Sequence, residues 1–305
     1  MKKRTTTLLA ASLALGGAIL GTNQLFRMAT VASEKTVVPD DVYPDNVLFA
    51  NQERFNRLPR ETWTITSFDG LKLKAWYVAN QHSEKTVILS HGWRITKARM
   101  ATYGDLFYSL GFNVLVPDNR AHGESGGKFI GFGYLDRFDY LQWIDKVCQK
   151  DKQQKIVLMG MSMGATTVLS VSGEKLPNNV KAVISDSAYT SAYDELRYQA
   201  GHMFHLPAFP VLNVLNWMSG WRAGFQYSQA DARPLIAKSQ LPTLFIHGLA
   251  DDFVPTKMVY ELIKLHHGEH DVWLPKGAGH VAAFEEYPQE YIERVAAFLK
   301  RYVEF

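Results

Sequence analysis

The sequence predicts an α/β protein built on a largely parallel sheet with helices on both of its faces. Short apolar runs, each long enough for a buried strand, alternate along the chain with helix-length amphipathic segments. This alternation is typical of strand–helix–strand units, in which a helix connects two parallel strands. The predicted strands cover residues 86–89, 113–116, 155–159, 180–184, 243–246 and 271–274, and the predicted helices lie near residues 98–110, 135–150, 163–172, 256–266 and 288–302.

A hairpin and an insertion interrupt this pattern. Thr62–Thr66 and Leu71–Val78 have strand-like sequences on either side of turn residues, which predicts a hairpin at the start of the domain. Further along the chain, about 50 residues, from 188 to 238, separate two predicted strands. A connection made of a single helix would need far fewer residues. The insertion is rich in aromatic residues, so we expect a helical cap over the carboxyl edge of the sheet, where α/β proteins bind ligands. The predicted domain spans residues 62–305.

The charge distribution argues against a nucleic-acid partner. The chain has 33 basic and 30 acidic residues, and four of the basic ones lie within residues 1–32, which hold no Asp or Glu. The rest of the chain therefore has 29 basic against 30 acidic side chains. A near-neutral domain has no broad basic surface with which to neutralise phosphates.

Residues 1–32 have the pattern of a targeting segment. Three basic residues precede Thr5–Phe26, which carries no charge and contains a 14-residue apolar core, Leu8–Gly21. The core suits a signal peptide, whereas the whole span is long enough for a membrane helix of roughly 20 residues. A cleavage site of the small-x-small kind is weak, at residues 30–32. We therefore favour an uncleaved anchor, with an amphipathic or buried helix of a cytosolic protein as a further alternative.

The position of the basic residues predicts the orientation of such an anchor. Basic residues before the span place the N-terminus in the cytoplasm and the domain outside, at the cell membrane; a cleaved segment would leave the domain secreted. Residues 33–61 contain several Pro and Asp residues without clear periodicity, which predicts a tether or a strap over the domain surface. No pattern predicts an oligomeric state.

The sequence Gly160-Met161-Ser162-Met163-Gly164 lies between a predicted buried strand and a predicted helix. In a sharp strand-to-helix turn, small residues two positions before and after the serine prevent clashes, and the serine hydroxyl is held where a substrate carbonyl can reach it. By itself the motif is weak, because Ser162 would also serve as an ordinary helix N-cap. The turn predicts Ser162 as a nucleophile and the backbone N–H of Met163 as one oxyanion-hole donor.

A nucleophilic serine needs a base and an acid that orients the base, and both occur downstream. Asp251 follows one predicted strand and His280 follows the last one. Since the carboxyl ends of parallel strands meet at one edge of a sheet, we expect these side chains to converge on Ser162. Asp252 and Asp186 are rival acids, and no other histidine follows the final strand.

These motifs resemble those of the α/β-hydrolase superfamily, over roughly residues 62–303. The order Ser162, Asp251, His280 is that of the family, and Gly248–Pro255 is similar to the family's acid loop, which implies Asp251 as the catalytic acid. Ser90-His91-Gly92-Trp93 resembles the family's oxyanion loop, which assigns the second donor to the backbone of Trp93.

The same resemblance accounts for another group of residues. Asp118–Ser125 matches a further signature of the superfamily, with a mainly structural role, so His122 is expected to brace a loop. His266, His267 and His270 have no adjacent Cys and no convincing set of acidic ligands; the same holds for His202 and His205. The sequence therefore predicts no metal site and no cofactor.

We predict a serine hydrolase that cleaves a carboxylic ester through an acyl-enzyme, with a preference for an apolar acyl or leaving group because of the aromatic cap. An aminopeptidase or other amide hydrolase of the same fold is the nearest alternative. It would use a carboxylate to hold a substrate ammonium, and Asp194 and Glu195 are the candidates. The alternative of a different class is a non-catalytic binding module displayed on a membrane. The expected partner is a small ester or peptide-like molecule.

Overall fold

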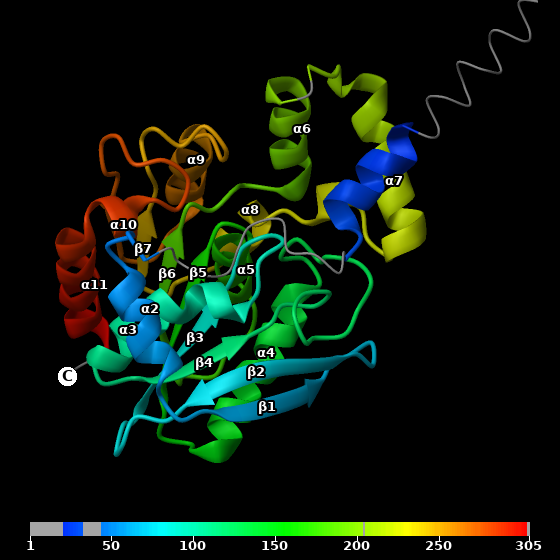
Figure 1. Cartoon of the computed structure of the whole chain (residues 1–305). Helices are drawn as coiled ribbons and strands as arrows, with labels where there is room; N and C mark the ends of the chain where they lie inside the picture. The colour runs from blue at the N-terminus through cyan, green and yellow to red at the C-terminus, as the bar shows by residue number, and fades with distance from the viewer. Residues whose placement is uncertain (1–20, 33–43, 204, 304–305) are drawn as a thin grey trace, which may run out of the picture.

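A computed structural model describes residues 21–32, 44–203 and 205–303 of this chain. Its centre is an eight-stranded sheet in the order β1-β2-β4-β3-β5-β6-β7-β8 (Figure 1). The first two strands pair antiparallel as the predicted hairpin, β2 is antiparallel to β4, and the others are parallel. The strands are β1 (Glu61–Thr66), β2 (Lys72–Val78), β3 (Lys85–Ser90), β4 (Asn113–Pro117), β5 (Lys155–Met161), β6 (Val180–Asp186), β7 (Thr243–Ile246) and β8 (His270–Trp273). The predicted fold class is confirmed.

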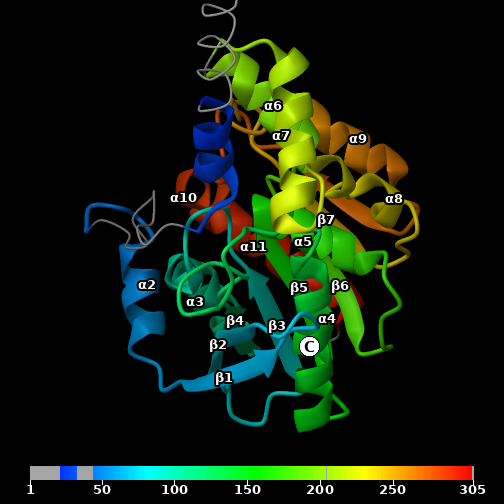
Figure 2. The same ribbon diagram turned by 90° about the vertical axis from the view of Figure 1, so that its right-hand side faces the viewer.

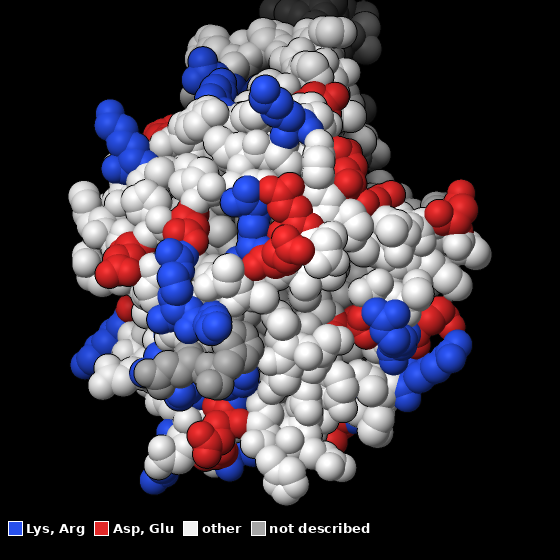
Figure 3. Space-filling view, turned by 90° about the vertical axis from the view of Figure 1, so that its left-hand side faces the viewer, with Lys and Arg blue, Asp and Glu red and all other residues white. Residues whose placement is uncertain are grey.

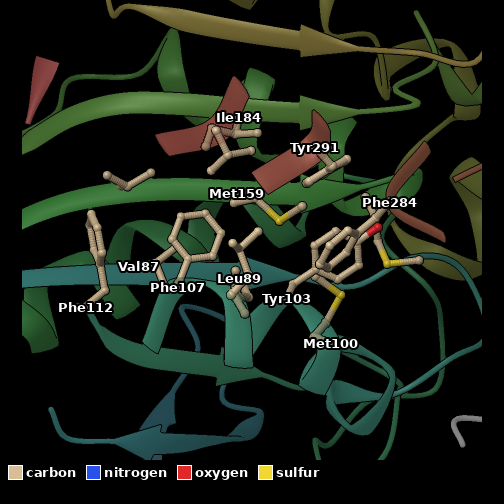
Figure 4. Close-up of a cluster of buried hydrophobic side chains, with 14 of the residues drawn as sticks. Val87, Leu89, Met100, Tyr103, Phe107, Phe112, Met159, Ile184, Phe284 and Tyr291 are labelled. Carbon is tan, nitrogen blue, oxygen red and sulfur yellow. The ribbon is translucent and has the colours of Figure 1, made fainter. Parts of the chain in front are cut away.

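Helices cover both faces of the sheet, and each face has its own apolar core. One core joins the sheet to α2 (Phe49–Asn56), α3 (Ala101–Ser109), α10 (Ala283–Glu286) and α11 (Pro288–Tyr302). Figure 4 shows part of it, with Phe107 and Tyr103 of α3 against Val87, Leu89 and Met159 of the sheet. The other core joins the sheet to α4 (Asp136–Lys150), α5 (Met163–Ser172), α8 (Arg233–Ile236) and α9 (Lys257–Leu265).

A helical cap lies between β6 and α8, within the predicted insertion. It contains α6 (Ala192–His202), α7 (Ala208–Ala223) and a short 3-10 turn at Tyr227–Gln229. Its buried side chains belong to a third apolar cluster, which we call the cap cluster. This cluster includes Leu212, Leu215, Phe225 and Tyr227 together with Met163 beside the predicted nucleophile. The cap therefore packs directly on the end of the sheet that carries Ser162.

The region predicted as a tether contains a helix that its sequence pattern did not indicate. Phe55 of α2 is fully buried, and a Cβ added to Gly104 of α3 would lie only 2.6 Å from the Phe55 ring. Arg54 of α2 also pairs with the buried Asp105 of α3, at 2.6 Å. Helix α2 is thus held by its contacts with α3. Residues 33–43 of the predicted tether lie outside the described residues.

Residues 21–32 form an N-terminal segment that packs on the domain. Residues 21–30 are helical and lie beside α7 (Figures 1 and 2). Phe26 is fully buried in the cap cluster, and Val31 forms a β-bridge with Phe129. The end of the predicted charge-free span, residues 21–26, therefore lies on the domain. Residues 1–20 lie outside the described part of the chain.

No helix among the described residues is long and apolar enough to cross a membrane. On the face that Figure 3 shows, Lys and Arg side chains are interspersed with Asp and Glu. This face has no continuous basic surface of the kind that binds a nucleic-acid backbone.

Candidate active site

Ser162 lies in a strained turn between β5 and α5. Its backbone has φ +53° and ψ −119°, a conformation that residues with a Cβ rarely adopt. Glycine is required on both sides: a Cβ on Gly160 would lie 2.2 Å from the carbonyl oxygen of Gly164, and one on Gly164 would lie 2.0 Å from that of Ser90. The turn can therefore form only because both positions are glycine. The turn places Ser162 at the N-terminus of a helix.

The structure brings Ser162, His280 and Asp251 into one hydrogen-bonded chain. Nε2 of His280 lies 2.9 Å from Oγ of Ser162, and Nδ1 of His280 lies 2.8 Å from Oδ2 of Asp251. A carboxylate at Nδ1 selects the tautomer whose Nε2 is free to accept the serine proton. The three residues come from the loops after β5, β7 and β8, so the convergence expected from the parallel strands is present.

Asp251 is held in place by the loop that contains it. Its Oδ1 accepts hydrogen bonds from the backbone N–H groups of Phe253 (3.0 Å) and Val254 (2.8 Å). Its side chain is completely buried, whereas that of His280 remains 20% exposed. The two N–H donors thus fix the Asp251 carboxylate in the position from which its other oxygen meets the imidazole of His280.

The two rival acids lie elsewhere. Asp186, at the end of β6, accepts hydrogen bonds from the Tyr291 hydroxyl (3.0 Å) and the Ser187 hydroxyl (3.1 Å). Burial raises the pKa of Asp186 to about 6. The side chain of Asp252 is exposed, and its backbone carbonyl accepts from Tyr198. Of the three acids, Asp251 alone has a hydrogen bond to His280 among the described contacts.

Asp186 and Ser187 support the site in a way that sequence patterns did not reveal. The carbonyl of Asp186 accepts the N–H of Ser162 at 2.8 Å, and the Ser187 hydroxyl accepts the N–H of Val281, next to His280, at 3.2 Å. The end of β6 thus braces both the nucleophile turn and the histidine loop. No sequence signal distinguishes such backbone contacts from ordinary strand ends.

The loop after β3 approaches the nucleophile closely. A Cβ added to Gly92 would lie 3.5 Å from Cβ of Ser162. His91 fixes this loop: its Nε2 accepts the N–H of Asn119 at 2.9 Å, so its Nδ1–H donates to the carbonyl of Gly92 at 2.8 Å. Burial lowers the pKa of His91 to about 4, so the ring is neutral at pH 7. Trp93, predicted as an oxyanion donor through its backbone, lies in this loop, and its indole N–H donates to the carbonyl of Ala29 at 2.9 Å.

The segment 118–125 is an internal brace. His122 is almost fully buried; its Nε2 accepts the N–H of Arg94 at 3.1 Å and its Nδ1–H donates to the carbonyl of Arg120 at 2.9 Å. Burial lowers the pKa of His122 to about 3. A neutral histidine with both nitrogens engaged holds the loop rather than accepting a substrate proton. Among the residues that the structure describes, no group of three or more side chains could hold a metal ion.

This fold and this arrangement of residues are those of an α/β-hydrolase enzyme. Residues 81–221 match the family model described as serine aminopeptidase, S33. The uncharacterized protein YqkD of Bacillus subtilis is 27% identical over 81% of both chains. The uncharacterized protein YfhR of Escherichia coli K12 is 27% identical, over 84% of this chain and 85% of that protein.

Solved structures give the same class. An esterase of Pyrococcus furiosus superposes with a TM-score of 0.66 and 25% identity, over 82% of this chain and 95% of the esterase. An acylaminoacyl peptidase of Pyrococcus horikoshii superposes with a TM-score of 0.57 and 18% identity, over 82% of this chain and 43% of the peptidase. Because the peptidase is only 18% identical, its similarity to this chain shows a shared fold and nothing more.

Substitution of Asp251 and of Asp186 tests which of the two is the catalytic acid. We expect Asp251→Asn to lower the hydrolysis rate by about 10⁴, because an amide at this position favours the wrong tautomer of His280. Asp186→Asn retains an acceptor for Tyr291, so its rate should stay within about tenfold of the wild-type rate. Steady-state kinetics on one chromogenic ester would measure both. A larger loss in Asp186→Asn than in Asp251→Asn would reassign the acid.

Proposed function

We propose that this chain is a serine carboxylic-ester hydrolase in which Ser162 is the nucleophile, His280 the general base and Asp251 the acid. The observation that carries this proposal is the chain of two hydrogen bonds, 2.9 and 2.8 Å long, that links the three side chains. The likeness to an esterase of known structure supports the ester as substrate class.

The geometry supports a two-step acyl transfer. Nε2 of His280 takes the proton of Ser162 as Oγ attacks the ester carbonyl, and the imidazolium then gives this proton to the leaving alcohol. Water, deprotonated by His280, next attacks the acyl-enzyme and releases the acid and the free serine. The N–H of Met163, at the start of α5, and the backbone N–H of Trp93 are the donors that we assign to the oxyanion. Asp251 stays ionised throughout.

The surroundings of the site favour an apolar acyl or leaving group. The ring of Phe253 lies 4.9 Å from that of His280, measured between centroids. Met163, Phe132 and Tyr189 are buried members of the apolar cluster beneath the cap, and Met163 directly follows Ser162. Apolar side chains gain free energy by burying the apolar part of a substrate, about 25 cal/mol for each Å².

Covalent labelling tests the nucleophile. A fluorophosphonate probe should label the wild-type protein at one serine and should not label Ser162→Ala, because the probe needs an activated hydroxyl. Ser172→Ala is the matched control, since Ser172 is a buried serine at the other end of the same helix. Mass spectrometry of the labelled peptide reads the result. A folded wild-type protein that the probe leaves unlabelled would instead support the non-catalytic binding module.

An amide hydrolase is the second candidate, and one observation favours it. Glu195 of α6 is buried in the cap, and its Oε2 has no hydrogen-bond partner among the described residues. Burial raises the pKa of Glu195 to about 8. Oε1 of Glu195 accepts from Gln199 at 2.8 Å, which leaves Oε2 as the atom to hold the ammonium group of an aminoacyl substrate. Asp194 is less suited, because it already pairs with Arg233 at 3.0 Å.

The two candidate functions differ in their response to pH and to Glu195→Gln. For an esterase, p-nitrophenyl esters should turn over at least about 100-fold faster than aminoacyl-p-nitroanilides, and Glu195→Gln should change the ester rate by less than about threefold. For an aminopeptidase, the anilide rate should rise towards a pH of about 8 and fall above it, because Glu195 gains its charge with a pKa of about 8 while the substrate's α-amino group, with an ordinary pKa of about 7.7–8.0, loses its charge. The same substitution would then abolish the anilide rate. Initial rates on both substrate panels between pH 6 and 9 separate the outcomes.

We also propose that the chain is held at the cell membrane by its uncleaved N-terminal segment, with the domain outside the cytoplasm. The packing of residues 21–32 supports this proposal. Cleavage after Ala32 would remove Phe26 from the cap cluster and would leave the indole of Trp93 and the hydroxyl of Tyr227 without the partners that Ala29 and Thr30 supply. Loss of such buried partners costs about 1–3 kcal/mol each.

The mature protein tests this assignment. In protein purified from membranes of an expressing cell, we expect mass spectrometry to find the peptide that contains Phe26, and alkaline carbonate washing to leave the protein in the membrane fraction. Protein that begins after Ala32 and is found outside the cell would show that the segment is a cleaved signal.

A further inference from the structure

The outer face of α7 is largely apolar and carries no charge. Four of its six exposed residues, Pro210, Val214, Trp217 and Trp221, follow one another at intervals of three or four, which places them in one stripe along the helix. The other two are Phe209 and the polar Asn213. Val214, Trp217 and Trp221 are 42, 64 and 76% exposed. A surface helix normally carries polar and charged side chains on its outer face. The only charged residue of α7 is Arg222.

Exposed apolar side chains gather around this stripe. Among the described residues, six of the eleven exposed large apolar side chains belong to the cap and to the N-terminal segment: Met28, Met203, Phe209, Val214, Trp217 and Trp221. The Trp217 and Trp221 rings lie nearly parallel, with centroids 6.3 Å apart. We call Phe209, Val214, Trp217 and Trp221 the aromatic face of α7. A soluble monomer rarely leaves such a patch in water unless something binds it.

The N-terminal segment is fixed next to this face. Arg222 of α7 donates a hydrogen bond to Oδ1 of Asn23 at 2.6 Å, and its guanidinium lies 4.8 Å from the centre of the Phe26 ring. The two helices lie side by side in both Figure 1 and Figure 2. The described chain therefore begins, at Gly21, beside the helix that carries the exposed tryptophans.

The sequence before Gly21 has the composition of a segment that inserts into a lipid bilayer. From Thr5 to Leu20 the chain has no charged residue, and Lys2, Lys3 and Arg4 precede this stretch. Such a segment favours insertion into a lipid bilayer, with its basic end at an anionic surface. It continues into the helix that lies against α7, so the bilayer that holds the segment would lie next to the cap.

We infer that the aromatic face of α7 rests in the headgroup region of the bilayer into which the N-terminal segment inserts. Tryptophan prefers this region, because its ring is apolar and its N–H can still reach water or a headgroup. The inserted N-terminal segment keeps the aromatic face near the lipid. A modest apolar contact is therefore enough to hold the face there. This inference rests on the proposed membrane anchoring of the N-terminal segment, and it does not depend on the proposed ester hydrolysis.

Fluorescence quenching by lipid tests the contact directly and needs no enzyme activity. The full-length chain is reconstituted into vesicles of phosphatidylcholine and phosphatidylglycerol, with and without bromine on the acyl chains near the headgroups. We expect brominated lipid to quench part of the tryptophan emission, and the double variant Trp217→Phe/Trp221→Phe to lose more than half of that quenched part. Trp76→Phe is the matched control, because Trp76 lies in β2 of the hairpin, and it should retain the quenched part.

The opposite results would overturn the inference. Equal quenching in the wild type and the double variant would show that neither tryptophan meets lipid. A second variant, Trp217→Glu/Trp221→Glu, distinguishes the other occupant of the face: if lipid quenching is absent and this variant converts a cross-linked dimer into a monomer, a second copy of the chain covers the face. Circular dichroism and thermal unfolding check that each variant is folded.

Discussion

The turn at Ser162 exists because two side chains are absent. Gly160 and Gly164 let the end of β5, the start of α5 and the end of β3 approach to distances at which any Cβ would overlap a backbone atom. The left-handed backbone of Ser162 is itself unfavourable, by about 1–3 kcal/mol. Since β5 and α5 are buried almost throughout, their packing can hold the turn in this conformation. The same close approach brings the loop of Gly92 against the nucleophile.

The parallel arrangement of the strands supplies the rest of the site. Residues that follow β5, β7 and β8 lie at one edge of the sheet, although Ser162 and His280 are separated by 118 positions in the chain. The strand between them, β6, braces the site through backbone contacts of Asp186 and Ser187 rather than through chemistry of its own. The site is therefore rigid because its loops are joined to one another and not only to the sheet.

The N-terminal segment joins the cap to the oxyanion loop. Trp93 donates to the carbonyl of Ala29, and the Thr30 hydroxyl shares a hydrogen bond with the Tyr227 hydroxyl of the cap. Phe26 fills the apolar cluster between them. Residues 21–32, the cap and the predicted oxyanion loop therefore form one packed unit.

Local patterns in the sequence determined the parallel sheet, the hairpin and the motif around Ser162, because strand periodicity and the need for glycine act over a few residues. The helix of Phe55 and the packing of Phe26 could not be predicted in this way, since both depend on surfaces that distant segments supply. The same holds for the choice between Asp186 and Asp251. Both acids follow buried strands, and only the tertiary structure decided which of them meets His280, because the direction of a side chain at a strand end depends on the loop and the neighbouring strands around it.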